Sequence, residues 1–102
     1  MTVVKKDNVH ELLVVAWHEG KVSFNTVHSL LRSDQRRIGA LEVRDVILYG
    51  EREPLYDKYN EQREHWTYSL RNKNVDGYDI RMIFDVEAYP QVIVVTVMHV
   101  YP

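Results

Sequence analysis

The sequence predicts an α+β domain in which N-terminal helices pack on a small antiparallel sheet of about four strands. Apolar residues follow helical spacing in the first half of the chain, and from Glu53 onward they alternate with a period of two. The chain has 102 residues, of which 45% are hydrophobic, so it can build one modest core. We therefore expect a single domain over residues 1–102, mainly helical over 1–50 and forming the sheet over 51–102.

The first helix is predicted over residues 8–18, where five apolar residues share one face: Val9, Leu12, Leu13, Ala16 and Trp17. Asp7 or Asn8 can begin this helix, and Gly20 can end it. Residues 21–24 then form a short extended link.

A second helix is predicted over residues 27–37, with Thr26 as its N-cap. The Ile38-Gly39-Ala40 step breaks it. A third, short helix follows over residues 41–48, and its inward residues are Val43, Val46 and Ile47. Gly50 ends that helix.

Four strands are predicted in the second half, over residues 55–59, 65–71, 80–86 and 91–101. Turns are expected at residues 72–77 and at Tyr89-Pro90. The last strand is apolar on both faces, which is typical of a central strand. Helices followed by strands in hairpins favour an antiparallel sheet.

The composition excludes several kinds of chemistry. The chain contains no cysteine, which rules out disulfides, thiol catalysis and cysteine-ligated zinc. The N-terminus shows no apolar signal sequence, and the longest apolar run, residues 92–97, is too short to span a bilayer. We therefore expect a cytoplasmic protein that does not enter a membrane. The net charge of −2 means that any contact with nucleic acid must rest on a local basic patch, and residues 32–37 are the best candidate.

No metal site is predicted. The chain has five histidines, but no pair has the close spacing of a zinc motif. His10 and His18, for example, are eight residues apart. The glycine-rich nucleotide-binding motifs and the serine hydrolase motif are also missing from the sequence. We expect no cofactor.

The residues that could carry chemistry gather on the second predicted helix. His28, Arg32 and Arg36 are four residues apart and so share one helix face. An imidazole could transfer a proton there, and guanidinium groups could bind a phosphate. The alternative is a solvated helix face whose arginines form ion pairs with carboxylates such as Glu42 or Asp45.

Further candidates lie on the sheet. His99 and Tyr101 share one face at the end of the last strand, where a rigid sheet could fix a second acid–base pair; the alternative is a packed histidine and a terminal tyrosine. Arg71 and Arg81 lie on neighbouring strands and, with Arg37, could extend a phosphate-binding surface. Alternatively, the two strand arginines protect an exposed sheet face, and His65 could join either arrangement.

The order of these pieces resembles a known group of proteins. A helix and the tripeptide VSF precede the pattern His-x-x-x-Arg-x-x-x-Arg-x-Ile with Glu-Val, and a Gly-Glu turn, a tyrosine-containing strand and the run VIVVTVMHVY follow. The chain resembles, over residues 9–101, small prokaryotic domains of unknown function grouped with the RelE/ParE and BrnT toxin superfamily. The residues that carry the resemblance are Phe24, His28, Arg32, Arg36, Ile38, Glu42, Val43, Gly50 and Thr96.

The resemblance implies a helical hairpin on a small antiparallel sheet and a metal-independent ribonuclease that a cognate antitoxin neutralises. His28 would be the general base or acid, and Arg32 and Arg36 would hold the scissile phosphate. His99 and Tyr101 would be the second acid–base pair. Two other functions stay open. One is a non-catalytic domain that binds a protein or a nucleic acid, and the other is an antitoxin or immunity-type partner, for which an acidic chain is suited. A homodimer also stays open.

Overall fold

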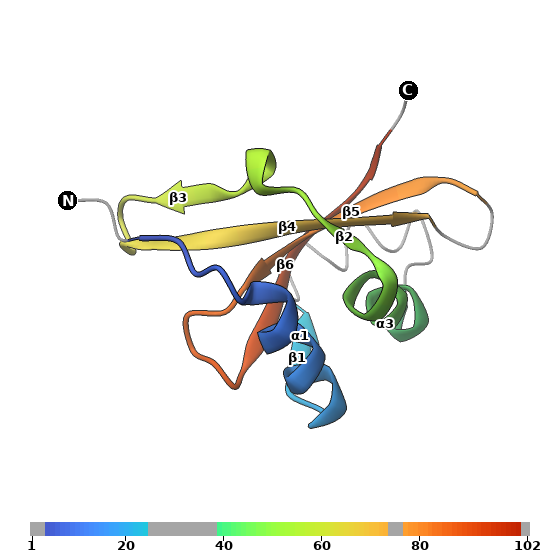
Figure 1. Cartoon of the computed structure of the whole chain (residues 1–102), viewed down its shortest axis with the longest axis horizontal. Coiled ribbons are helices and arrows are strands. Elements are labelled where there is room, and N and C mark those ends of the chain that lie inside the picture. The colour runs from blue at the N-terminus through green and yellow to red at the C-terminus, as the bar shows by residue number, and fades with distance from the viewer. Residues whose placement is uncertain (1–3, 25–38, 74–76, 101–102) are drawn as a thin grey trace.

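The structure is a computed structural model, and it describes residues 4–24, 39–73 and 77–100. The predicted α+β class is confirmed. Helices α1 (Val9–His18) and α3 (Ala40–Tyr49) lie on one side of a six-stranded sheet, and no described α-helix covers its other face (Figure 1). The core fills the space between these two layers.

Both described helices agree closely with their predicted ranges. Helix α1 buries Val9, Leu13 and Ala16, and α3 buries Val43, Val46 and Ile47, because residues three and four apart share a helix face. The His10 Nε2 atom lies 2.6 Å from the carbonyl oxygen of Ile47 and joins the two helices. The helix predicted over residues 27–37 lies outside the described residues.

Gly50 follows α3, but it does not adopt the left-handed conformation for which glycine usually ends a helix. Its backbone is extended, with φ −75° and ψ 172°, rather than left-handed. A Cβ atom at this position would overlap the carbonyl oxygen of Val46 and crowd that of Arg71. Gly50 is therefore required by the close approach of two backbones, and it lets the chain pass directly from α3 into the sheet.

The strand order is β1-β6-β5-β4-β2, and β3 also pairs with β4. The strands are β1 (Val22–Phe24), β2 (Glu51–Arg52), β3 (Lys58–Asn60), β4 (His65–Lys73), β5 (Asp79–Asp85) and β6 (Val92–Val100). Strand β1 is parallel to β6, and the other pairs are antiparallel. The predicted link at residues 21–24 is thus a strand, and β6 lies between two strands as its apolar sequence predicts.

The strand predicted over residues 55–59 is present only at its end, where β3 begins at Lys58. This stretch instead forms a 3-10 turn, η1 (Pro54–Tyr56), and continues into β3. Pro54 stands in the first turn of η1, where its missing N–H group costs nothing. The Asp57 carboxylate then accepts a hydrogen bond of 2.8 Å from the Ser69 N–H group, in the place of a strand partner. Two short strands therefore replace one longer strand, and with β1 they raise the count above the expected four.

The two faces of the sheet differ sharply. Alternate residues of β4, β5 and β6 face the helices and are buried: Tyr68, Leu70, Ile80, Met82, Phe84, Val94 and Val97. The opposite side, which we call the open face, is formed by the intervening residues: Thr67, Ser69, Arg71, Arg81, Ile83, Asp85, Ile93, Thr96 and Met98. Within the described ranges, no helix is long and apolar enough to cross a membrane.

Candidate functional site

The predicted site residues divide into two groups. His28, Arg32, Arg36, Arg37 and Tyr101 lie outside the described residues, so their roles stay predictions. The described structure places His99, Arg71 and Arg81.

His99 lies near the end of β6, and its Cα partner on β5 is Ile80. It is half-buried, and its ring centroid lies 6.0 Å from that of Tyr78, with the two planes tilted by 44°. The side chain shares the face of Ile80, which turns toward the helices. His99 and the arginines of the open face therefore belong to opposite sides of the sheet.

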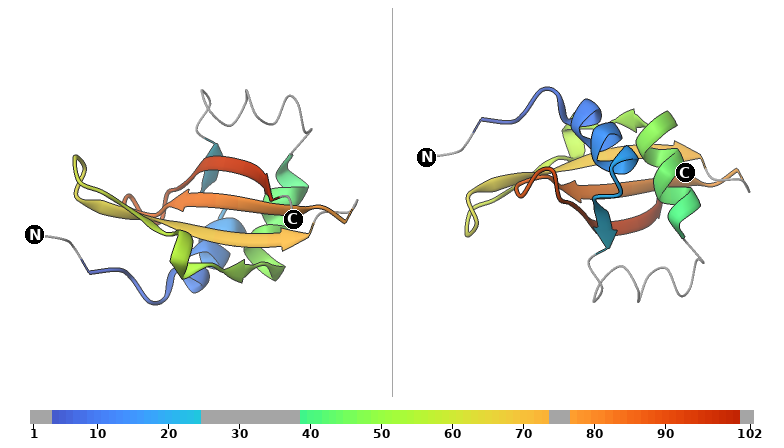
Figure 2. Two further views of the ribbon diagram at one scale, coloured as in Figure 1. Left: turned by 90° about the horizontal axis from the view of Figure 1, so that it is seen from above. Right: turned by 90° about the horizontal axis from the view of Figure 1, so that it is seen from below.

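The segment that carries His28, Arg32 and Arg36 joins the described structure at two places. It follows Phe24, which pairs with Val94 of β6, and it precedes Gly39, the N-cap of α3. The Gly39 N–H group donates a 3.0 Å hydrogen bond to the Glu42 carboxylate, which fixes the start of the helix. In both views of Figure 2, β6 passes between β1 and the start of α3.

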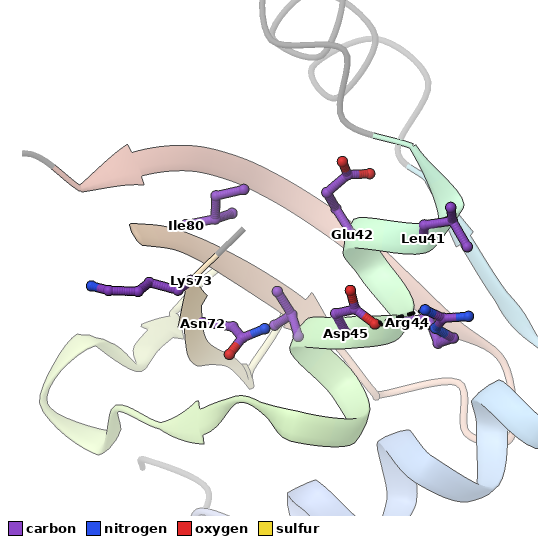
Figure 3. Close-up of a pocket in the computed structure, with 8 residues that line it drawn as sticks. Leu41, Glu42, Arg44, Asp45, Asn72, Lys73 and Ile80 are labelled. Atoms are coloured by element: carbon purple, nitrogen blue, oxygen red, sulfur yellow. Dashed lines mark hydrogen bonds and ion pairs between the residues drawn. The ribbon is translucent and has the colours of Figure 1, made fainter. Parts of the chain in front are cut away.

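A hollow of about 200 Å³, which we call the α3 hollow, lies between α3 and the adjacent ends of β4 and β5. Its deep part is apolar, since Val46 and Ile80 are almost fully buried. Its rim is polar and mostly charged (Figure 3). The lining residues are Leu41, Glu42, Arg44, Asp45, Val46, Asn72, Lys73 and Ile80.

Two polar groups of the α3 hollow retain unused hydrogen-bonding capacity. Asp45 uses its Oδ1 atom to accept bonds of 3.1 and 3.0 Å from Arg44, and no other described residue bonds its Oδ2 atom. Asn72 pairs through its backbone with Ile80, and its side-chain amide has no partner in the described part of the chain. An apolar cavity with a few polar groups of this kind is typical of a small-ligand site.

Arg71 and Arg81 are direct partners across β4 and β5 on the open face. The Arg81 guanidinium donates two hydrogen bonds to the Glu53 carboxylate, at 2.7 and 3.1 Å, and lies 3.6 Å from the centre of the Tyr56 ring. Arg71 forms an ion pair with Asp79 and lies 3.7 Å from Glu53. We call this set the Glu53 network.

These pairs occupy the cations of the open face. The hydrogen bond from Arg81 lowers the pKa of Glu53 despite its burial, and hydrogen bonds from Arg71 and Lys73 lower the pKa of Asp79. A phosphate would have to compete with both carboxylates for the two guanidinium groups. This geometry favours the alternative in which the arginines protect an exposed sheet face.

A second set, the Asp57 network, lies at the sheet edge beside Tyr68. The Asp57 side chain is fully buried and accepts bonds of 2.9 and 2.7 Å from Arg52, together with a bond of 3.1 Å from Lys5. Burial acts to raise the pKa of Asp57, but hydrogen bonds from Arg52, Ser69 and Lys5 outweigh it and lower the pKa.

Ser69 connects the two networks. Its N–H group donates to Asp57, and its hydroxyl donates to Glu53 at 3.2 Å. Its carbonyl accepts bonds from the Glu53 N–H group at 2.9 Å and from Arg52 at 2.7 Å. One fully buried serine thereby contacts both carboxylates.

His65 does not join the arginines of the open face. It begins β4, whereas Arg71 lies near the end of that strand. Its Nε2 atom lies 3.0 Å from Asp85 Oδ2, and its Nδ1 atom lies 3.3 Å from the carbonyl oxygen of Arg63. The buried His65–Asp85 pair thus fastens β4 to β5.

Sequence reasoning missed Glu53, Asp57 and Asn72 as organising residues. The alternation Glu51-Arg52-Glu53 before Pro54 was the available signal for the two networks, since charges alternate across a strand there. Asn72 gave only a turn signal. Among residues 4–24, 39–73 and 77–100, no group of three or more histidines and carboxylates is placed to hold a metal ion.

A family profile described as "Domain of unknown function (DUF4258)" matches residues 26–99. The match begins just after β1, includes α3 and the rest of the sheet, and ends at His99. It provides no link to the RelE/ParE or BrnT proteins. A search of curated proteins found no significant match, and neither did a search of solved structures.

Proposed function

The chain belongs to the DUF4258 family of domains of unknown function, and we propose that it is a metal-independent ribonuclease of the toxin type, paired with an antitoxin. His28 acts as general base or acid, and Arg32 and Arg36 hold the scissile phosphate. His99 and Tyr101 form the second acid–base pair.

One observation supports this proposal above the others. The segment that carries His28, Arg32 and Arg36 begins beside β6 at Phe24 and ends at the start of α3, and β6 with His99 passes between these two points (Figure 2). Phe24 pairs with Val94 of β6, the strand that also carries His99, and this pairing supports a site shared by the two predicted groups of residues. Residues that act together must meet in this way.

The chemistry requires only side chains of this type. A histidine removes the proton of the ribose 2′-hydroxyl, which then attacks the adjacent phosphorus. Two guanidinium groups stabilise the negative charge that develops on the phosphate oxygens. A second acid protonates the leaving oxygen.

The test is induced expression of the wild type, His28→Ala and Arg32→Ala, with growth and total RNA followed over time. We expect arrest and RNA cleavage with the wild type and neither with the two variants. His18→Ala and Arg63→Ala are matched controls, because both residues are exposed and lie outside the segment in the sequence; they should behave as the wild type. Normal growth and intact RNA at equal soluble expression of the wild type would refute the proposal.

A second candidate is a non-catalytic protein-binding domain, and the open face favours it. Its described arginines are paired with carboxylates, and beside them lies an apolar hollow of about 300 Å³ lined in part by Ile83, Val95 and Met98. The expression test separates the candidates, since a binding domain would neither stop growth nor cleave RNA. Met98→Glu would then abolish capture of a partner, while Glu61→Lys, in an exposed turn and not among the residues that line the hollow, would not.

A further inference from the structure

We propose that the α3 hollow is a nucleobase pocket that selects guanine. This inference rests on the proposed ribonuclease, because it names the base that the enzyme would hold beside the scissile phosphate. The hollow begins immediately after Gly39, the point where the segment with the predicted phosphate-binding arginines enters the described structure.

The size of the hollow suits one planar base. A volume of about 200 Å³ is smaller than the cavities that hold drug-sized ligands. It opens between a helix and two strands, with Val46 and Ile80 as apolar surfaces and Leu41, 63% exposed, at the rim. Aliphatic side chains of this kind favour an aromatic ring over a hydrated sugar or phosphate.

The polar groups match the edge of guanine. Guanine presents two adjacent donors, its N1–H and N2–H₂ groups, beside the O6 acceptor. A carboxylate oxygen has two lone pairs, so Asp45 Oδ2, which Arg44 leaves free, can accept from both donors, and an amide can donate to O6. Asp45 and Asn72 supply these two groups from α3 and β4, and Figure 3 shows Asn72 extending from its strand toward the helix.

The charge of the rim fits a nucleotide rather than a free base. Glu42 is engaged with the Gly39 N–H group, and Arg44 holds one oxygen of Asp45. Lys73 stands at the opposite rim and is exposed, with an ion pair of 3.3 Å to Asp79. Because the Lys73 side chain is 68% exposed, its ion pair with Asp79 is weak, and a phosphate attached to the bound nucleoside can replace that carboxylate.

The first measurement is binding of mononucleotides to the wild-type protein, followed by NMR titration. We expect guanosine monophosphate to bind at least about tenfold more tightly than inosine monophosphate, which lacks the N2 amino group, because one hydrogen bond to a charged acceptor is lost. The adenosine, cytidine and uridine monophosphates should bind more weakly still. Equal affinities across the set, or no binding at millimolar concentration, would overturn the inference.

Substitutions in the α3 hollow test whether the nucleotide binds there. Asp45→Asn should reduce guanosine monophosphate binding at least about tenfold, because the amide presents a single neutral acceptor instead of a charged one. Asn72→Ala should also weaken binding, and Glu61→Gln, in an exposed turn between β3 and β4, should not. Unchanged binding in Asp45→Asn, with a melting temperature equal to that of the wild type, would exclude the pocket.

The binding assay separates failure of the pocket from failure of the ribonuclease. If the wild type cleaves RNA and Asp45→Asn cleaves the same positions at the same rate, the ribonuclease stands and the base pocket is refuted. If guanosine monophosphate binds through Asp45 but RNA stays intact, the pocket stands and the ribonuclease is refuted.

Discussion

Strands β4 and β5 present two surfaces that are stabilised by different forces. The surface toward α1 and α3 is made of aliphatic and aromatic side chains, and Phe84 at its centre is fully buried. The open face carries charge pairs, in which Arg81 binds Glu53 and Arg71 binds Asp79. Neighbouring residues on one strand thus belong to two different environments.

The difference shows where stability and adaptability lie in this domain. Apolar burial contributes roughly 25 cal/mol for each Å² removed from water and does not depend on direction. Partly exposed ion pairs contribute little free energy but fix the positions of their side chains. The helix-covered surface should therefore determine whether the chain folds, and changes on the open face should cost much less stability.

The largest expected difference in the free energy of unfolding is between a buried residue on β5 and an exposed residue on the adjacent strand β6. Phe84→Ala should lower the free energy of unfolding by about 3–5 kcal/mol, because it leaves a cavity in the core. Ile93→Ala on the open face, where Ile93 is 36% exposed, should cost about 1 kcal/mol or less. Urea denaturation of both variants measures the contrast, and similar losses would show that the open face is covered by something that excludes water.

The next effect tests whether charge can matter as much as apolar burial. Asp57→Asn should lower the free energy of unfolding by about 2–3 kcal/mol, because it leaves Arg52 without its charged partner in a buried site. The loss stays below that of a fully enclosed pair, since Arg52 reaches water. A change below about 0.5 kcal/mol in urea denaturation would mean that the amide replaces every hydrogen bond of the carboxylate.

The pH dependence of stability follows from the same groups. The pKa values of Asp57, Glu53 and Asp79 are lowered in the folded state, so the unfolded chain binds more protons at acidic pH. Their contribution is fully present above the ordinary values of 3.8 and 4.5 and is lost as pH falls through the folded values. Thermal unfolding between pH 7 and pH 3 should show this decline, with a shallower decline in Asp57→Asn. An identical slope in that variant would contradict the assignment.

The smallest expected effects lie within the Glu53 network. Glu53→Gln should lower the free energy of unfolding by about 1 kcal/mol, because the carboxylate is largely buried and two Arg81 hydrogen bonds weaken. Asp79→Asn, a matched change at the more exposed end of the same network, should cost less, because the Asp79 side chain is 24% exposed against 14% for Glu53. Chemical denaturation of both variants measures the two losses in the free energy of unfolding. A larger loss in Asp79→Asn than in Glu53→Gln would contradict the inferred order of burial.

The elements with a clear period were predictable from sequence. The apolar spacing of α1 and α3 and the alternation of β4, β5 and β6 each placed an element within about two residues of its observed bounds, because one periodicity matches one buried face. The parallel pairing of β1 was not predictable, since three residues carry no period and their partner lies far along the chain.

The structure of the segment around Pro54 was predicted incorrectly for a different reason. Its structure depends on the Asp57 carboxylate, which accepts a hydrogen bond from a backbone N–H group of β4. No local sequence pattern predicts such a contact. The candidate site divides in the same way. The sequence predicted Arg71 and Arg81 on neighbouring strands. It did not predict their carboxylate partners, Asp79 and Glu53, because Glu53 reaches Arg81 only through the pairing of distant strands.

Ser69 gives the sheet edge an internal reporter. Its amide proton is held by a titrating carboxylate instead of a neutral peptide oxygen. The chemical shift of that single amide will therefore follow the ionisation of Asp57, and its protection factor against hydrogen–deuterium exchange will fall when Asp57 becomes protonated. A spectroscopist can thus observe one buried acid through the resonance of its neighbour, without altering any residue of the protein.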